Sequence, residues 1–149
     1  MPDILLATDA ASVFEDLRAV VDGPGATIRW VREGADVRTS LNHRTADLAI
    51  VDMQIGTMGG VAVALDLRLE VDAGRLEPVP VLLVLDRRAD VFLARRSGVD
   101  GWLIKPLDPL RVRRGVRAVL AGGTWCDDSY TPDPVAVPFG SDSIDRSGK

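Results

Sequence analysis

The sequence predicts an α/β protein in which a doubly wound parallel sheet carries helices on both faces. Short apolar runs alternate with segments whose apolar residues recur at helical spacing, and five such pairs fit into about 120 residues. The runs are apolar at every position instead of every second one, which is typical of strands covered on both faces. A strand that returns through a helix to a neighbouring strand runs parallel to it. These observations favour three layers with the sheet in the middle.

Five strands are expected at the apolar runs. The second run is rich in β-branched and aromatic residues, and Pro80 stands directly before the fourth. Each run is short, as expected of a buried strand bounded by turn residues. The expected strands cover residues 4–7, 27–31, 48–51, 81–85 and 102–104.

Five helices are expected to follow these strands in turn. Glycine and proline in residues 22–25 end the first helix, and Gly98 closes the fourth. Asp108 is a suitable N-cap for the last helix, because its carboxylate can accept a hydrogen bond from a free backbone N–H group. The pair Gly122 and Gly123 ends that helix. The expected helices cover residues 13–21, 35–42, 61–71, 90–97 and 110–120.

One domain with a tail fits the length of 149 residues. We expect the domain at residues 1–123 and the tail at residues 124–149. The tail holds three of the nine prolines, many aspartates and serines, and no periodicity. Such a composition predicts partial disorder toward the end of the chain, with Trp125 a candidate to pin the start of the tail.

The sequence predicts a cytoplasmic protein. The single cysteine, Cys126, leaves no internal disulfide and fits a reducing compartment. The acidic start at residues 1–3, followed by a very short apolar run, is unlike a signal peptide. No segment approaches the roughly 18 apolar residues of a membrane span. We therefore expect no membrane contact.

The net charge of −4 conceals an uneven distribution along the chain. Residues 1–85 carry 7 basic and 13 acidic side chains, residues 86–117 carry 9 and 4, and residues 118–149 carry 2 and 5. The basic middle stretch is either a partner face or the solvated surface of arginine-rich helices. The acidic balance of the whole domain argues against a nucleic-acid partner.

Two charged residues stand at the ends of predicted strands. Asp52 follows the run 48–51, and Lys105 follows the run 102–104. In an open parallel sheet, ligands bind in the crevice outside the carboxyl ends of the strands. A carboxylate and an ammonium group at this edge suit phosphoryl chemistry.

Three stretches together resemble the receiver domain of bacterial two-component response regulators, of the chemotaxis type. They are residues 4–9, 46–60 and 98–109, and the resemblance covers about residues 3–121. The resemblance implies a flavodoxin-like sandwich with strand order 2-1-3-4-5. It also implies a signalling protein whose only chemistry is Mg²⁺-dependent self-phosphotransfer.

The resemblance assigns roles to five residues. Asp52 is then the phosphorylated carboxylate, and Lys105 pairs first with Asp52 and then with the phosphoryl group. Asp9, Asp52 and the main-chain carbonyl of Gln54 hold a Mg²⁺ ion, a cation that prefers oxygen ligands. Trp102 stands at the position of the switch aromatic. In such a site, position and charge neutralisation do most of the work.

Several positions depart from the family pattern. Thr8 replaces an acidic metal ligand, which weakens the expected Mg²⁺ site. Leu85 replaces the serine or threonine whose hydroxyl binds the phosphoryl group, and Asp86 follows it with a charge that repels phosphate. Gly56 replaces the usual proline after the acceptor. Pro106 matches a proline that typically follows a cis peptide bond.

These departures leave two functions open. The favoured one is a stand-alone, atypical receiver that acts through protein contacts, with weak or no phosphorylation of Asp52. The alternative is a functional phospho-accepting receiver, dependent on Mg²⁺, that passes a phosphorelay signal to a partner. In both, the fourth helix, fifth strand and fifth helix meet a histidine kinase or an output protein, and a homodimer stays open. The arginines expected near that face are Arg87, Arg88, Arg95, Arg96, Arg111, Arg113, Arg114 and Arg117.

A flavin-binding electron carrier of similar topology is disfavoured. The loop over residues 8–12 lacks a glycine-rich phosphate cradle and carries the acidic Asp9 where a phosphate would sit.

Overall fold

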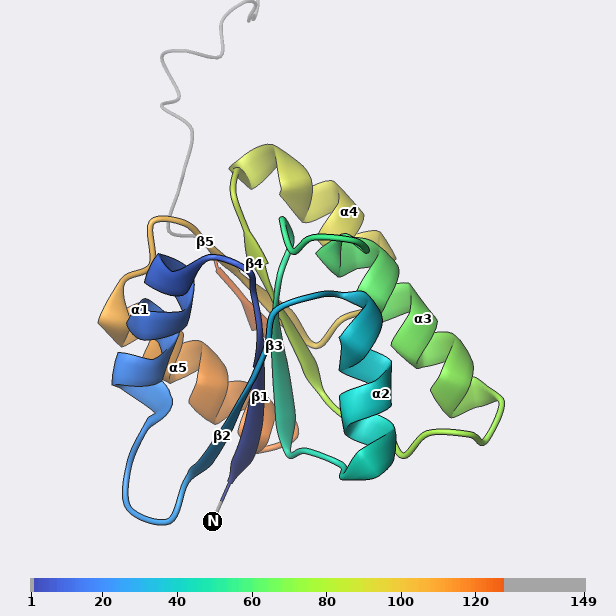
Figure 1. Cartoon of the computed structure of the whole chain (residues 1–149). Helices are drawn as coiled ribbons and strands as arrows, with labels where there is room; N and C mark the ends of the chain where they lie inside the picture. Colours follow the sequence, from blue (N-terminus) through green and yellow to red (C-terminus); the bar gives the residue numbers. More distant parts are fainter. Residues whose placement is uncertain (1, 128–149) are drawn as a thin grey trace, which may run out of the picture.

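A computed structural model describes residues 2–127 and contains one parallel sheet (Figure 1). The strand order is β2-β1-β3-β4-β5-β6, and every neighbouring pair is parallel. The predicted α/β class and the order 2-1-3-4-5 are therefore confirmed, with one further strand at the edge. The strands are β1 (Asp3–Ala7), β2 (Thr27–Val31), β3 (Leu48–Asp52), β4 (Val81–Leu85), β5 (Gly101–Ile104) and β6 (Trp125–Cys126).

The helices lie where the apolar periodicity predicts them. The segment expected to be one helix over residues 90–97 is a short 3₁₀ turn that leads directly into an α-helix. Among the described residues, no helix is long and apolar enough to cross a membrane. The helices are α1 (Ala11–Val21), α2 (Ala35–His43), α3 (Gly60–Asp72), η1 (Arg88–Asp90), α4 (Val91–Arg96) and α5 (Pro109–Leu120).

Two apolar cores lie on opposite faces of the sheet. Figure 1 shows α1 and α5 on one face and α2, α3 and α4 on the other. Successive residues of a strand point to opposite faces, so Leu5 joins the core under α2 and α3 while Leu6 joins the core under α1 and α5. All five residues of β3 and all five of β4 are buried. This double coverage explains why the strands are apolar throughout.

The ends of the helices follow local rules. The Asp108 carboxylate accepts a hydrogen bond from the backbone N–H of Leu110 at 3.2 Å, and Pro109 is the first helical residue of α5. Gly98 has a φ of 75° just after α4, a conformation that favours glycine. The Lys105–Pro106 peptide bond is cis, as the resemblance implies.

The sixth strand extends the fold beyond its predicted boundary. Gly122, with a φ of 91°, turns the chain after α5, and Trp125–Cys126 then pairs with Gly101–Trp102 of β5. The fold thus continues through Asp127 instead of ending at Gly123. A strand of two residues is too short to leave a periodic signal in the sequence. Residues 128–149 lie outside the described residues, so the expected partial disorder of the tail stays a prediction.

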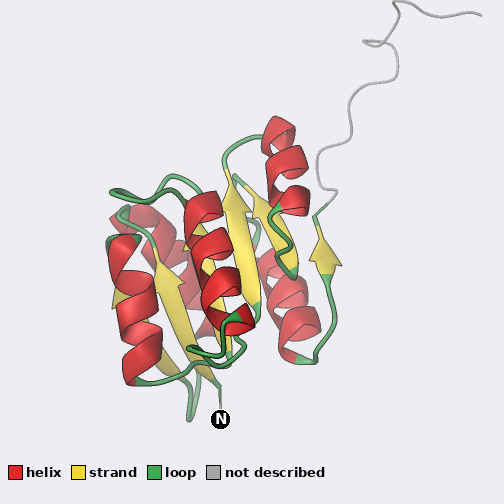
Figure 2. Cartoon of the chain, turned by 90° about the vertical axis from the view of Figure 1, so that its right-hand side faces the viewer, coloured by secondary structure: helices red, strands yellow, loops and turns green. Residues whose placement is uncertain are grey.

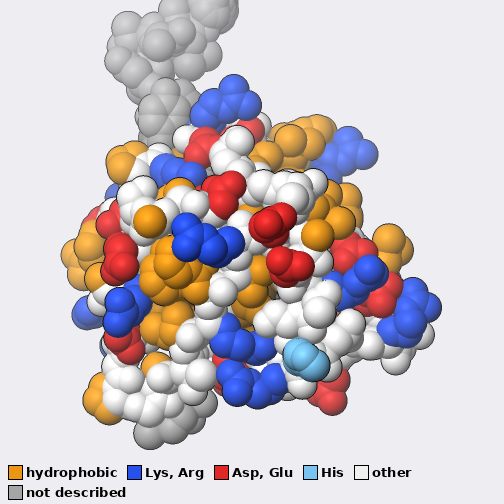
Figure 3. Space-filling view, in the orientation of Figure 1, with side chains coloured by type: hydrophobic (Ala, Val, Ile, Leu, Met, Phe, Trp, Pro, Cys, Tyr) orange, Lys and Arg blue, Asp and Glu red, His pale blue; other side chains and the backbone are white. Residues whose placement is uncertain are grey.

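The uneven charge of the sequence does not separate into one acidic and one basic surface on the face seen in Figure 3. There, acidic and basic side chains are interspersed with hydrophobic ones. A mixed surface of this kind is typical of a domain that meets water or proteins.

Candidate functional site

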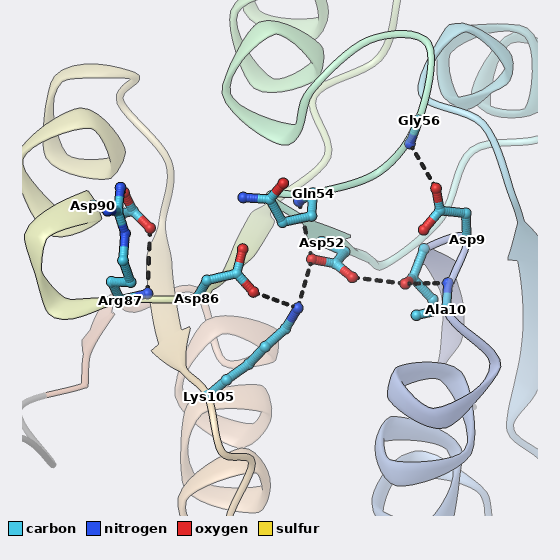
Figure 4. Close-up of polar contacts among 10 residues, drawn as sticks. Asp9, Ala10, Asp52, Gln54, Gly56, Asp86, Arg87, Asp90 and Lys105 are labelled. Atoms are coloured by element: carbon cyan, nitrogen blue, oxygen red, sulfur yellow. Dashed lines mark hydrogen bonds and ion pairs between the residues drawn. The ribbon is translucent and has the colours of Figure 1, made fainter.

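The carboxyl ends of four neighbouring strands bring polar side chains together (Figure 4). Asp52 is the last residue of β3, and Thr8 follows β1 directly. Asp86 follows β4, and Lys105 follows β5. Because Leu85 pairs with Ile104 in the parallel register, the next residue on each strand, Asp86 and Lys105, also lie beside each other.

Asp52 is a buried carboxylate with both oxygens hydrogen-bonded. Its exposed fraction is 2%. One oxygen, Oδ2, accepts from the Thr8 hydroxyl at 2.7 Å. The other, Oδ1, accepts from the backbone N–H of Gln54 at 3.1 Å and from Lys105 Nζ at 3.2 Å. These partners compensate a charge that would otherwise be costly to bury.

Lys105 is shared between two carboxylates. Its ammonium group lies 2.7 Å from Asp86 Oδ1 and 3.2 Å from Asp52 Oδ1, so Asp86 is the closer partner. Burial lowers the pKa of the Lys105 ammonium, but the hydrogen bonds and charges of Asp86 and Asp52 outweigh burial, and the pKa lies above its ordinary value. The second oxygen of Asp86, Oδ2, is buried without a hydrogen-bond partner. Lys105 is therefore already engaged by an anion of the chain itself.

Thr8 connects Asp52 to the start of α1. Its hydroxyl donates to Asp52 and accepts from the backbone N–H of Ala10 at 3.1 Å. Ala10 is the residue before α1, so Thr8 both supports the helix start and contacts the Asp52 carboxylate. The side chain is fully buried. The Thr8 hydroxyl thus stabilises the charged Asp52 carboxylate by a hydrogen bond and adds no charge of its own.

Asp9 lies at the exposed rim of the same edge. Its Oδ2 accepts from the backbone N–H of Gly56 at 3.1 Å, which ties the end of β1 to the loop between β3 and α3. A Cβ atom added at Gly56 would lie 3.1 Å from the same oxygen, a contact tighter than usual. The glycine at this position thus permits the close approach of Asp9.

Leu85 and Trp102 pack in the core beside the site. Leu85 is fully buried, and Trp102 has an exposed fraction of 5%. Both belong to the core under α2, α3 and α4. The Trp102 ring is covered by the Arg95 guanidinium at 5.5 Å from its centroid, while its buried Nε1 has no hydrogen-bond partner. Trp102 is therefore a packed core residue, and its role as a switch stays a prediction.

The pairing of Asp86 with Lys105 was missed by reasoning from the sequence, which treated Asp86 only as a repelling charge. A signal for it does exist. Both residues stand immediately after strands expected to be neighbours and parallel, which places their side chains side by side.

Comparison with known proteins decides the family. The family model described as the response regulator receiver domain matches residues 4–117. The chain belongs to this family. Response regulator PmrA of Pseudomonas aeruginosa is 32% identical over 116 residues, covering 78% of this chain and 51% of that protein. The DNA-binding response regulator MtrA of Mycobacterium tuberculosis is 32% identical over 117 residues, covering 78% and 50%.

Solved structures show the same fold. The signal receiver domain of a signal transduction histidine kinase from Syntrophus aciditrophicus has a TM-score of 0.72 at 26% identity, covering 82% of this chain and 92% of that chain. A LuxR-family two-component response regulator from Aurantimonas has a TM-score of 0.75 at 20% identity, covering 87% and 91%.

This receiver domain spans about half the length of the curated relatives it matches. Some of those relatives are named as DNA-binding regulators. The expectation of no nucleic-acid partner is therefore not supported by the comparisons.

Receiver domains generally bind Mg²⁺ at the acidic site around the acceptor aspartate. Here the resemblance assigns the ion to the carboxylates of Asp9 and Asp52 and to the main-chain carbonyl of Gln54. The Thr8 hydroxyl donates its hydrogen bond to Asp52 and carries no charge. Among residues 2–127, no group of three histidine, cysteine or acidic side chains is placed to hold a metal ion. Oxygen donors are the ligands that Mg²⁺ prefers, so these residue types fit the ion.

Proposed function

We propose that this receiver domain passes its signal through protein contacts that do not depend on phosphorylation of Asp52. The observation that carries the proposal is the engagement of Lys105 by Asp86 at 2.7 Å. In the phospho-accepting reading, the Lys105 ammonium neutralises the incoming phosphoryl group. In this chain the Asp86 carboxylate already pairs with that ammonium group.

Accepting a phosphoryl group would disrupt several contacts at once. An Asp52 oxygen would have to attack phosphorus while it gives up its hydrogen bond from Thr8 or from Lys105 and Gln54. The new dianionic group would lie near the Asp86 carboxylate, and like charges repel. Leu85 offers no hydroxyl to bind a phosphoryl oxygen. Each of these features supports slow or absent phosphorylation.

A second candidate is a functional phospho-accepting receiver. The observation in its favour is that Asp9, Asp52 and Lys105 lie at one edge of the sheet. In this candidate Asp9, Asp52 and the Gln54 carbonyl hold a Mg²⁺ ion, which supplies charge neutralisation when bound. Its partner is a kinase upstream and an output protein downstream.

The intact mass of the purified protein after incubation with acetyl phosphate and Mg²⁺ separates the two candidates. Asp52→Asn is the matched control, because it removes the acceptor and keeps the shape of the side chain. We expect no mass addition, or only a small fraction, in the native chain. Stoichiometric addition of a phosphoryl mass that disappears in Asp52→Asn would refute the proposal and establish the second candidate.

The proposed contact face is formed by α4, β5 and α5. It carries exposed apolar side chains, with exposed fractions of 62% for Phe92, 46% for Leu93 and 60% for Leu110. Arginines lie among them: the Arg96 guanidinium lies over the Phe92 ring at 5.3 Å from its centroid. Exposed aromatic and arginine side chains are enriched in protein interfaces, which supports a protein partner such as a histidine kinase or an output protein.

We also propose that this receiver domain acts without a covalently attached output domain. An immunoblot of the source cells tests it, because a stand-alone protein migrates near 16.0 kDa and a regulator with an output domain migrates well above that mass.

A further inference from the structure

The outer edge of β5 is covered by the segment Trp125–Asp127 (Figure 2). The Trp125 N–H donates to the Asp100 carbonyl at 3.0 Å, and the Asp127 N–H donates to the Trp102 carbonyl at 3.3 Å. The N–H of Ile104 donates to Asp127 Oδ2 at 2.9 Å. A free sheet edge presents unpaired N–H and C=O groups that attract another strand. In this chain a side-chain carboxylate continues the pairing after the two residues of β6 end.

Two glycines make room for this segment. A Cβ atom at Gly115 of α5 would lie 2.9 Å from Cδ1 of the Trp125 ring, and 3.3 Å from Cδ2 of Leu103. A Cβ atom at Gly101 would collide with the Trp125 carbonyl oxygen. Glycine inside a helix is unfavourable, so its presence in α5 calls for a packing reason. The Trp125 ring fills the slot that the missing side chain leaves.

Asp127 provides a second, polar anchor. Its side chain is 1% exposed, and its Oδ1 lies 3.9 Å from the Arg111 guanidinium. A buried carboxylate is costly unless it is paired and hydrogen-bonded, so the site is selective for an acid at this position. Trp125 and Asp127 are two residues apart, which places both side chains on the same side of an extended segment. That side faces α5.

We propose that the outer edge of β5, bordered by Gly115 and Arg111, is a strand-accepting peptide site that this chain's own residues 125–127 occupy. The ligand it takes is an extended segment with an aromatic residue followed two positions later by a carboxylate. Main-chain hydrogen bonds supply affinity in such strand addition, and pockets for alternate side chains supply specificity. A partner strand of this kind binds the outer edge of β5 by displacing residues 125–127.

This inference deepens the proposed function, because β5 lies within the proposed contact face and the partner's chemistry is now specified. It does not involve Asp52 or a phosphodonor. A failed phosphorylation experiment and a failed peptide experiment therefore have separate meanings.

The test is peptide binding to the full-length chain, followed by fluorescence anisotropy. The probe is a fluorescein-labelled peptide with the sequence of residues 123–128, with serine in place of Cys126. We expect the doubly changed Trp125→Ala, Asp127→Asn chain to bind the probe at least about tenfold more tightly than the native chain, because a tethered segment competes at high effective concentration. Probes that lack the tryptophan or the aspartate should bind more weakly.

Two further variants control the experiment. The doubly changed chain is called the released chain. In it, Gly115→Ala fills the slot and should abolish probe binding. Gly23→Ala is a change of the same kind at an exposed turn, where an added Cβ meets nothing within 4 Å, and it should leave binding unchanged. Equal probe binding by native and released chains would show that the native segment does not occupy the edge. Failure of the folded released chain to bind the probe would show that the edge is not a peptide site.

A second measurement covers the case in which the doubly changed chain does not fold. Gly115→Ala alone pushes the Trp125 ring out of its slot and should speed hydrogen exchange of the Ile104 amide. Unchanged exchange at Ile104 would overturn the proposal.

Discussion

Replacing Asp86 by alanine tests how far the charge of this carboxylate opposes phosphorylation of Asp52. Lys105 Nζ lies 2.7 Å from Asp86 and 3.2 Å from Asp52, so oxygens of the two carboxylates lie no more than about 6 Å apart. At that separation two unit charges repel by roughly 3 kcal/mol at an effective dielectric constant of about 20. The side chain of Asp86 is 28% exposed, so solvent reduces this figure.

The expected result is faster phosphorylation of Asp52. A barrier lower by 1.4 kcal/mol corresponds to about a tenfold rate increase. With roughly half of the repulsion lost to screening, we expect Asp86→Ala to accelerate the reaction with acetyl phosphate by about tenfold. Stability should change by less than about 1 kcal/mol, because Lys105 keeps Asp52 as a partner and the buried, unpartnered oxygen of Asp86 is removed.

The assay is a time course of intact mass with acetyl phosphate and Mg²⁺. Asp66→Ala is the matched control, since Asp66 is also a partly buried carboxylate in an ion pair, with Arg38 at 3.2 Å, but lies on α3. The double variant with Asp52→Asn shows that added mass is on the acceptor. An unchanged rate in Asp86→Ala, or the same increase in Asp66→Ala, would refute the reasoning.

Three further outcomes are expected. Gly115→Ala should lower the melting temperature of the native chain but raise it in a Trp125→Ala background, where the clash is gone and alanine gains about 1 kcal/mol of helix propensity over glycine. Thr8→Asp should tighten Mg²⁺ binding, measured by isothermal titration calorimetry, and lower stability in metal-free buffer through repulsion with Asp52; no change in Mg²⁺ affinity would contradict the ligand assignment. Lys105→Met should reduce the loss of folding stability at alkaline pH. The pKa of Lys105 is raised in the folded state, so the charged ammonium stabilises the fold at pH values below its ordinary pKa of 10.5. This contribution is lost as the pH rises through the folded-state pKa. Denaturant midpoints across alkaline pH measure this, and an equal fall in both proteins would contradict it.

The fold was predictable because double burial leaves a strong signal. Strands such as β3 and β4 are covered on both faces, so apolar residues fill nearly every position. Runs of about five residues are too short for a buried helix, and Pro80 before β4 adds a boundary. Helix boundaries were predictable where a specific residue fixes them, as Asp108 does for α5. The prediction of the fourth helix was less accurate, because η1 and α4 are each too short to show a clear helical period in the sequence.

The candidate site was only partly predictable. The meeting of Asp9, Asp52 and Lys105 follows from their places at strand ends, and the structure brings all three to one edge. The sequence could not show which carboxylate lies nearer to Lys105, since that depends on side-chain conformations. The sixth strand was missed because its interactions are specific and few. Trp125 and Asp127 bind through one slot and one backbone N–H group, and neither produces a repeating pattern.

Strand β5 connects the Asp86–Lys105 ion pair with the edge segment Trp125–Asp127. The backbone N–H of Lys105 donates to the Leu85 carbonyl at 2.9 Å, which fixes Lys105 beside the start of the loop that carries Asp86. One residue earlier, the N–H of Ile104 is bound by the Asp127 carboxylate on the outer edge. The end of β5 is thus held from both sides by acidic residues of the chain itself. Phosphorylation of Asp52 would have to draw Lys105 away from Asp86, whereas displacement of residues 125–127 leaves that ion pair in place. Under the proposed function, a partner therefore binds at the edge of β5, or is excluded from it, while Asp52 stays unmodified.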